Sequence, residues 1–93
     1  MAVVGTATLD FGASGSAFNS VAVTGQASIL TSSVAEAFFM GDTSTDHTVE
    51  DHIITGSLCK LICSSLVAGT GFTIFASAEQ TLYGKYTVHW VWT

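Results

Sequence analysis

The densest group of side chains capable of chemistry lies between residues 42 and 52, which read DTSTDHTVEDH. Four of the seven acidic residues of the chain and two of its three histidines fall in this segment. They are Asp42, Asp46, His47, Glu50, Asp51 and His52. Hard divalent cations prefer several carboxylate oxygens on a loop, and imidazole nitrogens are also good metal ligands. A loop that binds a divalent cation is therefore one hypothesis for this segment.

The spacing of these residues departs from the calcium loop of an EF-hand. Counted from Asp42, the sixth position is His47, where that loop needs Gly, and the twelfth is Ile53, where it needs Glu. Two other uses are open. The side chains could cap and turn a polar loop, or they could fix the register with a neighbouring subunit in a pH-sensitive way. The sequence assigns no cofactor, and it keeps the cation loop as an alternative.

No residues of the chain form a recognisable catalytic set. A nucleophile needs a nearby base and a group that orients the base, and the many serines give no specific arrangement of this kind. Cys59 or Cys63 could be paired with His89, but buried structural cysteines are commoner than reactive ones. The glycines of AGTG at 68–71 do not lead from a strand into a helix, as a phosphate-binding loop would. We therefore predict that the protein is not an enzyme.

The elements that would position these side chains are predicted to be strands, because proline is absent and β-branched and aromatic residues form short runs between glycines and serines. Residues 3–11 alternate as a half-buried strand, and GASGS at 12–16 is predicted to turn them into a hairpin partner that runs to Gly25. The remaining expected strands are 26–30 (a continuation past a bulge), 34–40, 53–66, 72–76 and 86–92. Residues 42–51 are predicted to be a loop, with a short helical turn as an alternative, and 77–82 a second loop.

Short strands at intervals of about 8–12 residues are typical of small β-sandwiches and barrels. We therefore predict a single all-β domain over residues 1–93, either a small antiparallel sandwich or a jelly-roll-like barrel of about 6–8 strands. Large aromatic residues would anchor its core or an interface, and a carbohydrate-stacking surface is the alternative for the tryptophans. The predicted anchors are Phe72, Phe75, Tyr86, Trp90 and Trp92.

Charged residues make up only 10% of the chain, against about 25% in a typical soluble domain. Part of this weakly charged surface is therefore predicted to be buried against copies of the same chain. Lys60 and Lys85 are the only basic residues apart from histidine, which does not favour a nucleic-acid partner. No long apolar run or signal segment is present, so we expect synthesis in the cytoplasm and no membrane partner. Cys59 and Cys63 would lie about 13 Å apart in a strand and are expected to be free thiols.

Most of the chain also shows a family resemblance. The order of AEAFFMGDTSTDH, EDH, VAGTGFTIFA and YGKYTVHWVWT from residue 35 onward, with VTGQASI at 23–29, resembles small, mostly uncharacterised structural proteins of tailed bacteriophages and prophages. The resemblance implies a virion component made in the bacterial host cytoplasm, either a capsid decoration or a tail-associated protein. It implies symmetric oligomers and other virion proteins as partners. The alternative is a module at a tail tip or fibre that recognises a host-surface receptor or glycan.

Overall fold

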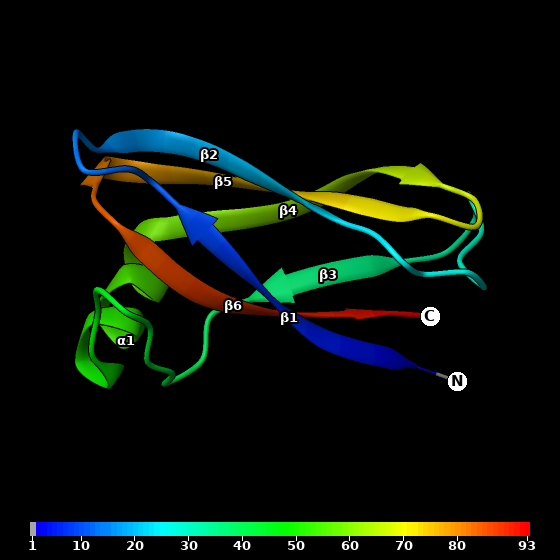
Figure 1. Ribbon diagram of the computed structural model, residues 1–93, viewed down its shortest axis with the longest axis horizontal. Helices are drawn as coiled ribbons and strands as arrows, with labels where there is room; N and C mark the ends of the chain where they lie inside the picture. Colours follow the sequence, from blue (N-terminus) through cyan, green and yellow to red (C-terminus); the bar gives the residue numbers. More distant parts are fainter. Residues whose placement is uncertain (1) are drawn as a thin grey trace.

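Alternating apolar residues fold the chain into two sheets whose inner faces pack together. The computed structural model describes residues 2–93 and contains two three-stranded antiparallel sheets (Figure 1). One sheet has the order β1-β6-β3, with β1 at Val3–Asp10, β6 at Lys85–Trp92 and β3 at Ala35–Phe38. The other has the order β2-β5-β4, with β2 at Ser16–Val23, β5 at Gly71–Leu82 and β4 at Cys59–Val67. The prediction of an all-β sandwich is confirmed.

The core lies between the two sheets and is built from every second residue of each strand. Leu9, Ile74 and Val88 are completely buried there. Trp90 crosses from β6 toward β1, and its indole Nε1–H donates a hydrogen bond to the carbonyl of Thr6 at 3.2 Å. Gly5 lies directly opposite Trp90 in the ladder, and a Cβ atom at residue 5 would overlap the indole ring. The missing side chain at Gly5 therefore makes room for the indole ring of Trp90.

The predicted hairpin between the first two strands is wrong, because β1 and β2 belong to opposite sheets. β1 pairs with β6 and β2 pairs with β5. The connection between β1 and β2 includes Gly12 and Gly15, whose φ angles of 80° and 81° are in the left-handed region that favours glycine. An apolar stripe specifies which face of a strand is buried but not which strand lies beside it. The apolar stripes of β1 and β2 are both buried because they face one another across the core.

The predicted strand over 53–66 is also wrong in its first half. A helix, α1, spans Val49–Leu58, and β4 begins only at Cys59. Thr48 caps the helix: the N–H of Asp51 donates to the Thr48 hydroxyl at 3.3 Å, and the N–H of Thr48 donates to the Asp51 carboxylate at 3.2 Å. This reciprocal pair satisfies two backbone donors that a helix start leaves free. The sequence allowed a short helical turn within residues 42–51, and the structure has a full helix that begins at Val49. This helix lies at the opposite end of the sandwich from the C-terminus (Figure 1).

Three further boundaries differ from the prediction. The expected loop at 77–82 is the second half of β5, which continues past an irregularity in its pairing with β2. Residues 26–30 are not a strand, because the chain turns at Gly25, where φ is 77°. Ile29 is 1% exposed and fills the core there instead. The strand expected at 34–40 is confirmed only in part, as the short strand β3.

Candidate functional site

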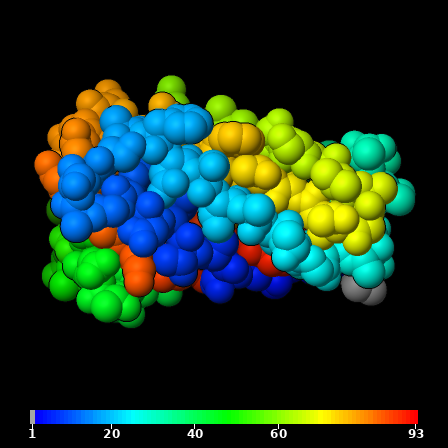
Figure 2. Space-filling model, turned by 45° about the horizontal axis from the view of Figure 1, so that its top comes forward, coloured from blue at the N-terminus to red at the C-terminus, as the bar shows by residue number. Residues whose placement is uncertain are grey.

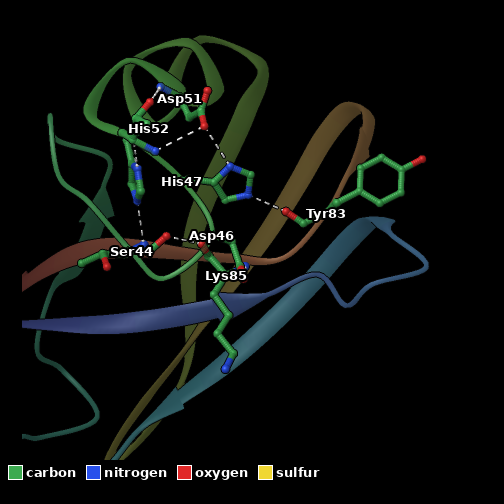
Figure 3. Close-up of polar contacts among 9 residues, drawn as sticks. Ser44, Asp46, His47, Asp51, His52, Tyr83 and Lys85 are labelled. Atoms are coloured by element: carbon green, nitrogen blue, oxygen red, sulfur yellow. Dashed lines mark hydrogen bonds and ion pairs between the residues drawn. The ribbon is translucent and has the colours of Figure 1, made fainter.

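The histidine-rich segment lies at the α1 end of the sandwich, beside the turn between β5 and β6 (Figure 3). The ring of His47 stacks on that of Tyr86, with centroids 3.9 Å apart and planes 11° from parallel. The His47 Nε2 atom is 2.6 Å from the carbonyl oxygen of Tyr83, and its Nδ1 atom is 3.2 Å from the carboxylate of Asp51. Both partners are acceptors, so only the doubly protonated imidazolium makes both hydrogen bonds. His47 thereby joins the start of α1 to the turn.

Asp51 takes part in both contacts that hold this end of α1. Its Oδ2 atom accepts from the backbone N–H of Thr48 and faces the ring of His47. The hydrogen bond from the Thr48 backbone, followed by the one from His47, lowers the pKa of the Asp51 carboxyl below its ordinary value. The carboxylate form is thus the one that the folded chain stabilises.

His52 is completely buried between α1 and β6. Its Nδ1–H donates to the carbonyl of Thr48 at 2.8 Å, and its Nε2 atom accepts from the backbone N–H of Thr87 at 3.0 Å. One ring nitrogen donates and the other accepts, which describes a neutral imidazole with both positions in use. His52 therefore acts as a link between helix and sheet, and neither nitrogen is left for a ligand.

Three further polar side chains of the segment, those of Asp42, Ser44 and Asp46, also contact other groups of the chain. Asp46 accepts from the backbone N–H of Lys85 at 2.8 Å, and the Ser44 hydroxyl donates to the carbonyl of the same residue. Asp42 contacts the His89 ring, while Glu50 is exposed in the first turn of α1. Among residues 2–93, no three His, Cys, Asp or Glu side chains are placed to hold one metal ion. These contacts agree with the hypothesis that the side chains of residues 42–52 cap and turn a polar loop.

Four of the five predicted aromatic anchors lie in the core, and the fifth does not. The buried ones are Phe72, Tyr86, Trp90 and Trp92. The two indoles point inward, and the Nε1–H of Trp92 donates to the side chain of Gln26 at 3.0 Å. Their faces are therefore not presented to a carbohydrate, contrary to the stacking alternative. Phe75 is half-buried and lies on the outer side of β5.

The outer face of the β2-β5-β4 sheet brings nine paired positions together in three rows. The rows are Ala22, Thr73 and Ser64, then Ser20, Phe75 and Ile62, then Phe18, Ser77 and Lys60. We call this set the bare face. Figure 2 shows β2 beside β5 at the surface with no other segment over them. Five of the nine side chains are small: Ala22, Thr73, Ser64, Ser20 and Ser77.

Three large apolar side chains, one from each strand, form a ridge across the bare face. The rings of Phe18 and Phe75 lie 6.2 Å apart, and Ile62 follows in the ladder next to Phe75. Phe18 is 59% exposed and Ile62 is 64% exposed, although both are large and apolar. Lys60 at one corner is the only charged residue of the nine. An uncharged face with a ridge of large apolar side chains is typical of an interaction surface.

Phe18 and Ile62 were not predicted from the sequence as members of this surface. The alternation Phe18, Ser20, Ala22 was available as a signal, because Val21 and Val23 of the same strand face the core and so place the even-numbered residues outside. Ile62 had no such signal, because β4 is apolar on both faces at this point. Which outer residues meet on one face depends on the order β2-β5-β4, which alternation does not give.

The cysteines face the inside of the same sheet and are free, as predicted. Burial raises the pKa of the Cys63 thiol to about 11, and the charge of Glu36 adds to the rise. Burial also raises the pKa of the Cys59 thiol. Because the thiolate is the reactive form, both cysteines are poor nucleophiles at neutral pH. A thiol reaction has no support in this geometry.

Comparisons with known proteins give no relative of this chain: no protein-family model matches it, and neither the curated proteins nor the solved structures contain a similar one. Within residues 2–93, the only helix is too short to cross a membrane. A function for this chain is therefore inferred from its fold and its surfaces.

Proposed function

We propose that this chain is a structural subunit that assembles with copies of itself through the bare face, as a component of a tailed bacteriophage particle. The observation that carries the proposal is the chemistry of that face. It has the apolar ridge of Phe18, Phe75 and Ile62 and a single charge among nine positions. Burying such side chains between two copies removes apolar area from water without separating charges from their solvent.

The shape of the bare face suits a two-fold arrangement. The row of Ala22, Thr73 and Ser64 is low, because these side chains are small, and it lies beside the apolar ridge. A two-fold rotation places the ridge of one copy over the low row of the other, and the reverse. Sheets that pack face to face interlock side chains in this way at a spacing of about 10 Å. The interface would be isologous, as in most symmetric dimers.

The charge distribution supports contact between identical chains. The net charge is −5, so two copies repel one another if their carboxylates meet. None of the nine positions of the bare face is acidic. Lys60 lies in a corner, from which its long stem can keep the ammonium group in water. A second acidic copy is therefore tolerated on this face more readily than elsewhere.

Placement in a virion rests on the low charge, the β-sandwich and the family resemblance together. The partners in this proposal are other copies of the chain and other virion proteins, and the protein is made in the host cytoplasm before assembly. The alternative, recognition of a host receptor or glycan at a tail tip, would also use copies of the chain held in a symmetric assembly.

The proposal is tested by two measurements on the intact chain. Size-exclusion chromatography with light scattering at micromolar concentration is expected to give a dimer or larger species, and mass spectrometry of purified particles is expected to detect the chain. A stable monomer that is missing from particles contradicts the proposal. Binding to intact host cells that is lost in the double variant Asp46→Ala, His47→Ala and kept in Ile62→Ser would favour the recognition alternative.

A further inference from the structure

A groove opens on the side of the sandwich where β3 of one sheet lies next to β4 of the other. It runs between the end of β3, the start of β4 and α1, and has a volume of about 550 Å³. It is lined by Ala37, Phe38, Phe39, Met40, His52, Ile53, Gly56, Ser57, Cys59 and Leu61. The groove shares no residue with the bare face, so binding in it is independent of the proposed self-assembly.

The edge of β3 that faces this groove has free backbone groups. Val34 and Thr93 exchange two backbone hydrogen bonds, of 3.1 and 2.9 Å. In an antiparallel ladder such pairs alternate with pairs that make none, so Glu36 and Phe38 direct their N–H and C=O groups toward β6. Ala35 and Ala37 direct theirs the other way. Within residues 2–93, no strand pairs with that side of β3.

The side chains around the groove are apolar and uncharged. None of the lining residues is a carboxylate, lysine or arginine, and the one histidine, His52, already uses both ring nitrogens. At the rim, Met40 is 50% exposed and Ile53 is 60% exposed. A free strand edge next to an apolar groove offers main-chain hydrogen bonds for affinity and pockets for alternate side chains. These are the two requirements for recognising an extended peptide.

We propose that the β3–β4 groove binds an extended segment of another polypeptide, which pairs with the free edge of β3 and places alternate apolar side chains in the groove. A single extended segment fits the position better than a second folded copy does. β4 and α1 bound the groove opposite β3, and a single extended segment needs less width between these elements than the edge of a second sandwich does. The bound segment would extend the β1-β6-β3 sheet by one strand.

The test uses a displayed library of random ten-residue peptides, panned on the full chain, followed by affinity measurements with one synthetic peptide that it yields. The matched pair of variants is Ile53→Asp and Ile54→Asp. These neighbours in α1 are 60% and 58% exposed, but only Ile53 lines the groove. A buried carboxylate without a partner opposes binding. Ile53→Asp is therefore expected to weaken binding at least tenfold and Ile54→Asp to leave it unchanged.

Amide hydrogen exchange of the complex gives the second readout. The Ala37 amide is expected to exchange more slowly when the peptide is bound, whereas the Glu36 amide, already directed toward β6, should not change. Selected peptides should alternate apolar residues and lack proline at the pairing positions. Failure to select any peptide, equal effects of the two variants, or an unchanged Ala37 amide would overturn the proposal. Self-association of the unmodified chain that Ile53→Asp abolishes would assign the groove to a second copy and would also overturn it.

Discussion

The two outer faces of this sandwich each belong to a three-stranded antiparallel sheet but differ in what lies over them. On the β1-β6-β3 side, Thr87 donates its hydroxyl to the Thr43 carbonyl at 3.1 Å, and His89 contacts Asp42 and stacks on Phe38. On the β2-β5-β4 side, the nine paired outer positions include one charge and an exposed apolar ridge. Asp42 and Thr43 thus lie over part of β6 on one face, whereas no segment of the described residues lies over the nine positions of the other.

The difference between the two faces shows where on the molecule charged groups are scarce. Four of the seven carboxylates contact other groups of the chain, namely Asp10, Asp42, Asp46 and Asp51. Groups that take part in such contacts are held by local geometry and serve the fold. The bare face has no such partner within the chain. The scarcity of charge therefore belongs mainly to one surface, and that surface is the candidate for assembly.

The largest effect on stability is expected from removing the side chain of His52, which links α1 to β6. His52→Ala removes a completely buried side chain, leaves the Thr87 N–H without its partner, and removes one of the two hydrogen bonds that the Thr48 carbonyl accepts. Loss of these hydrogen bonds and of the buried ring should lower the free energy of unfolding by about 2–4 kcal/mol. Urea denaturation measures it. The control is Glu50→Gln, an exposed change in the same helix, which should stay within about 0.5 kcal/mol.

A destabilisation by His52→Ala no larger than that of the control would contradict the role given to His52 as the link between α1 and β6. The two faces would then no longer differ in the way described, because the segment over β6 would not be held by the His52 hydrogen bonds.

Thiol labelling compares the two outer faces directly. Ser64→Cys lies in the low row of the bare face, and Thr8→Cys lies on the outer side of β1. Assembly should slow maleimide labelling of residue 64 about tenfold when nine-tenths of the chain is assembled, and leave residue 8 unchanged. Cys59 and Cys63 contribute little background, because the pKa of each thiol is raised. Equal rates at low and high concentration for residue 64 would count against the bare face as the interface.

A smaller, pH-dependent effect is expected at the helix start. The folded chain lowers the pKa of Asp51, so the carboxylate contributes stability that is present above its unfolded pKa of about 3.9 and is lost as pH falls further. Asp51→Asn should therefore destabilise the chain at pH 7, and the gap from the unmodified chain should narrow below about pH 4. Chemical denaturation at a series of pH values measures the gap. A stability gap that widens on acidification would contradict the lowered pKa of Asp51 in the folded chain.

The sequence predicted the parts of the fold that depend on alternation. β6 was foreseen almost to its ends, because Tyr86, Val88, Trp90 and Trp92 repeat every second residue and all face the core. α1 was foreseen only as a possible short helical turn within residues 42–51, although Thr48 and Asp51 have the spacing of a capping box. The apolar residues Ile53 and Ile54 outweighed that signal, and both prove to be exposed. Their exposure could not be read from apolar character alone.

The candidate surfaces were harder to foresee than the strands. Phe75 was predicted as an anchor, but its place on the outside could not be read from apolar character, because Phe72, Ile74 and Phe75 put apolar side chains on both faces of β5. The polar segment at 42–52 was identified correctly as the densest group, yet its side chains point to backbone groups of Tyr83, Lys85 and Thr87. These partners lie more than thirty residues away along the chain, and residue spacing carries no information about such contacts.

Sedimentation equilibrium of the unmodified chain, Ile62→Lys and Val4→Lys tests most directly whether the bare face is the assembly surface. Ile62 is 64% exposed on the bare face and Val4 is 73% exposed on the outer side of β1, so both changes place a lysine at an exposed strand position. We expect the unmodified chain and Val4→Lys to associate equally, and Ile62→Lys to weaken association at least tenfold. A chain that stays monomeric, or an association that Val4→Lys weakens as much as Ile62→Lys does, would contradict assembly through the bare face.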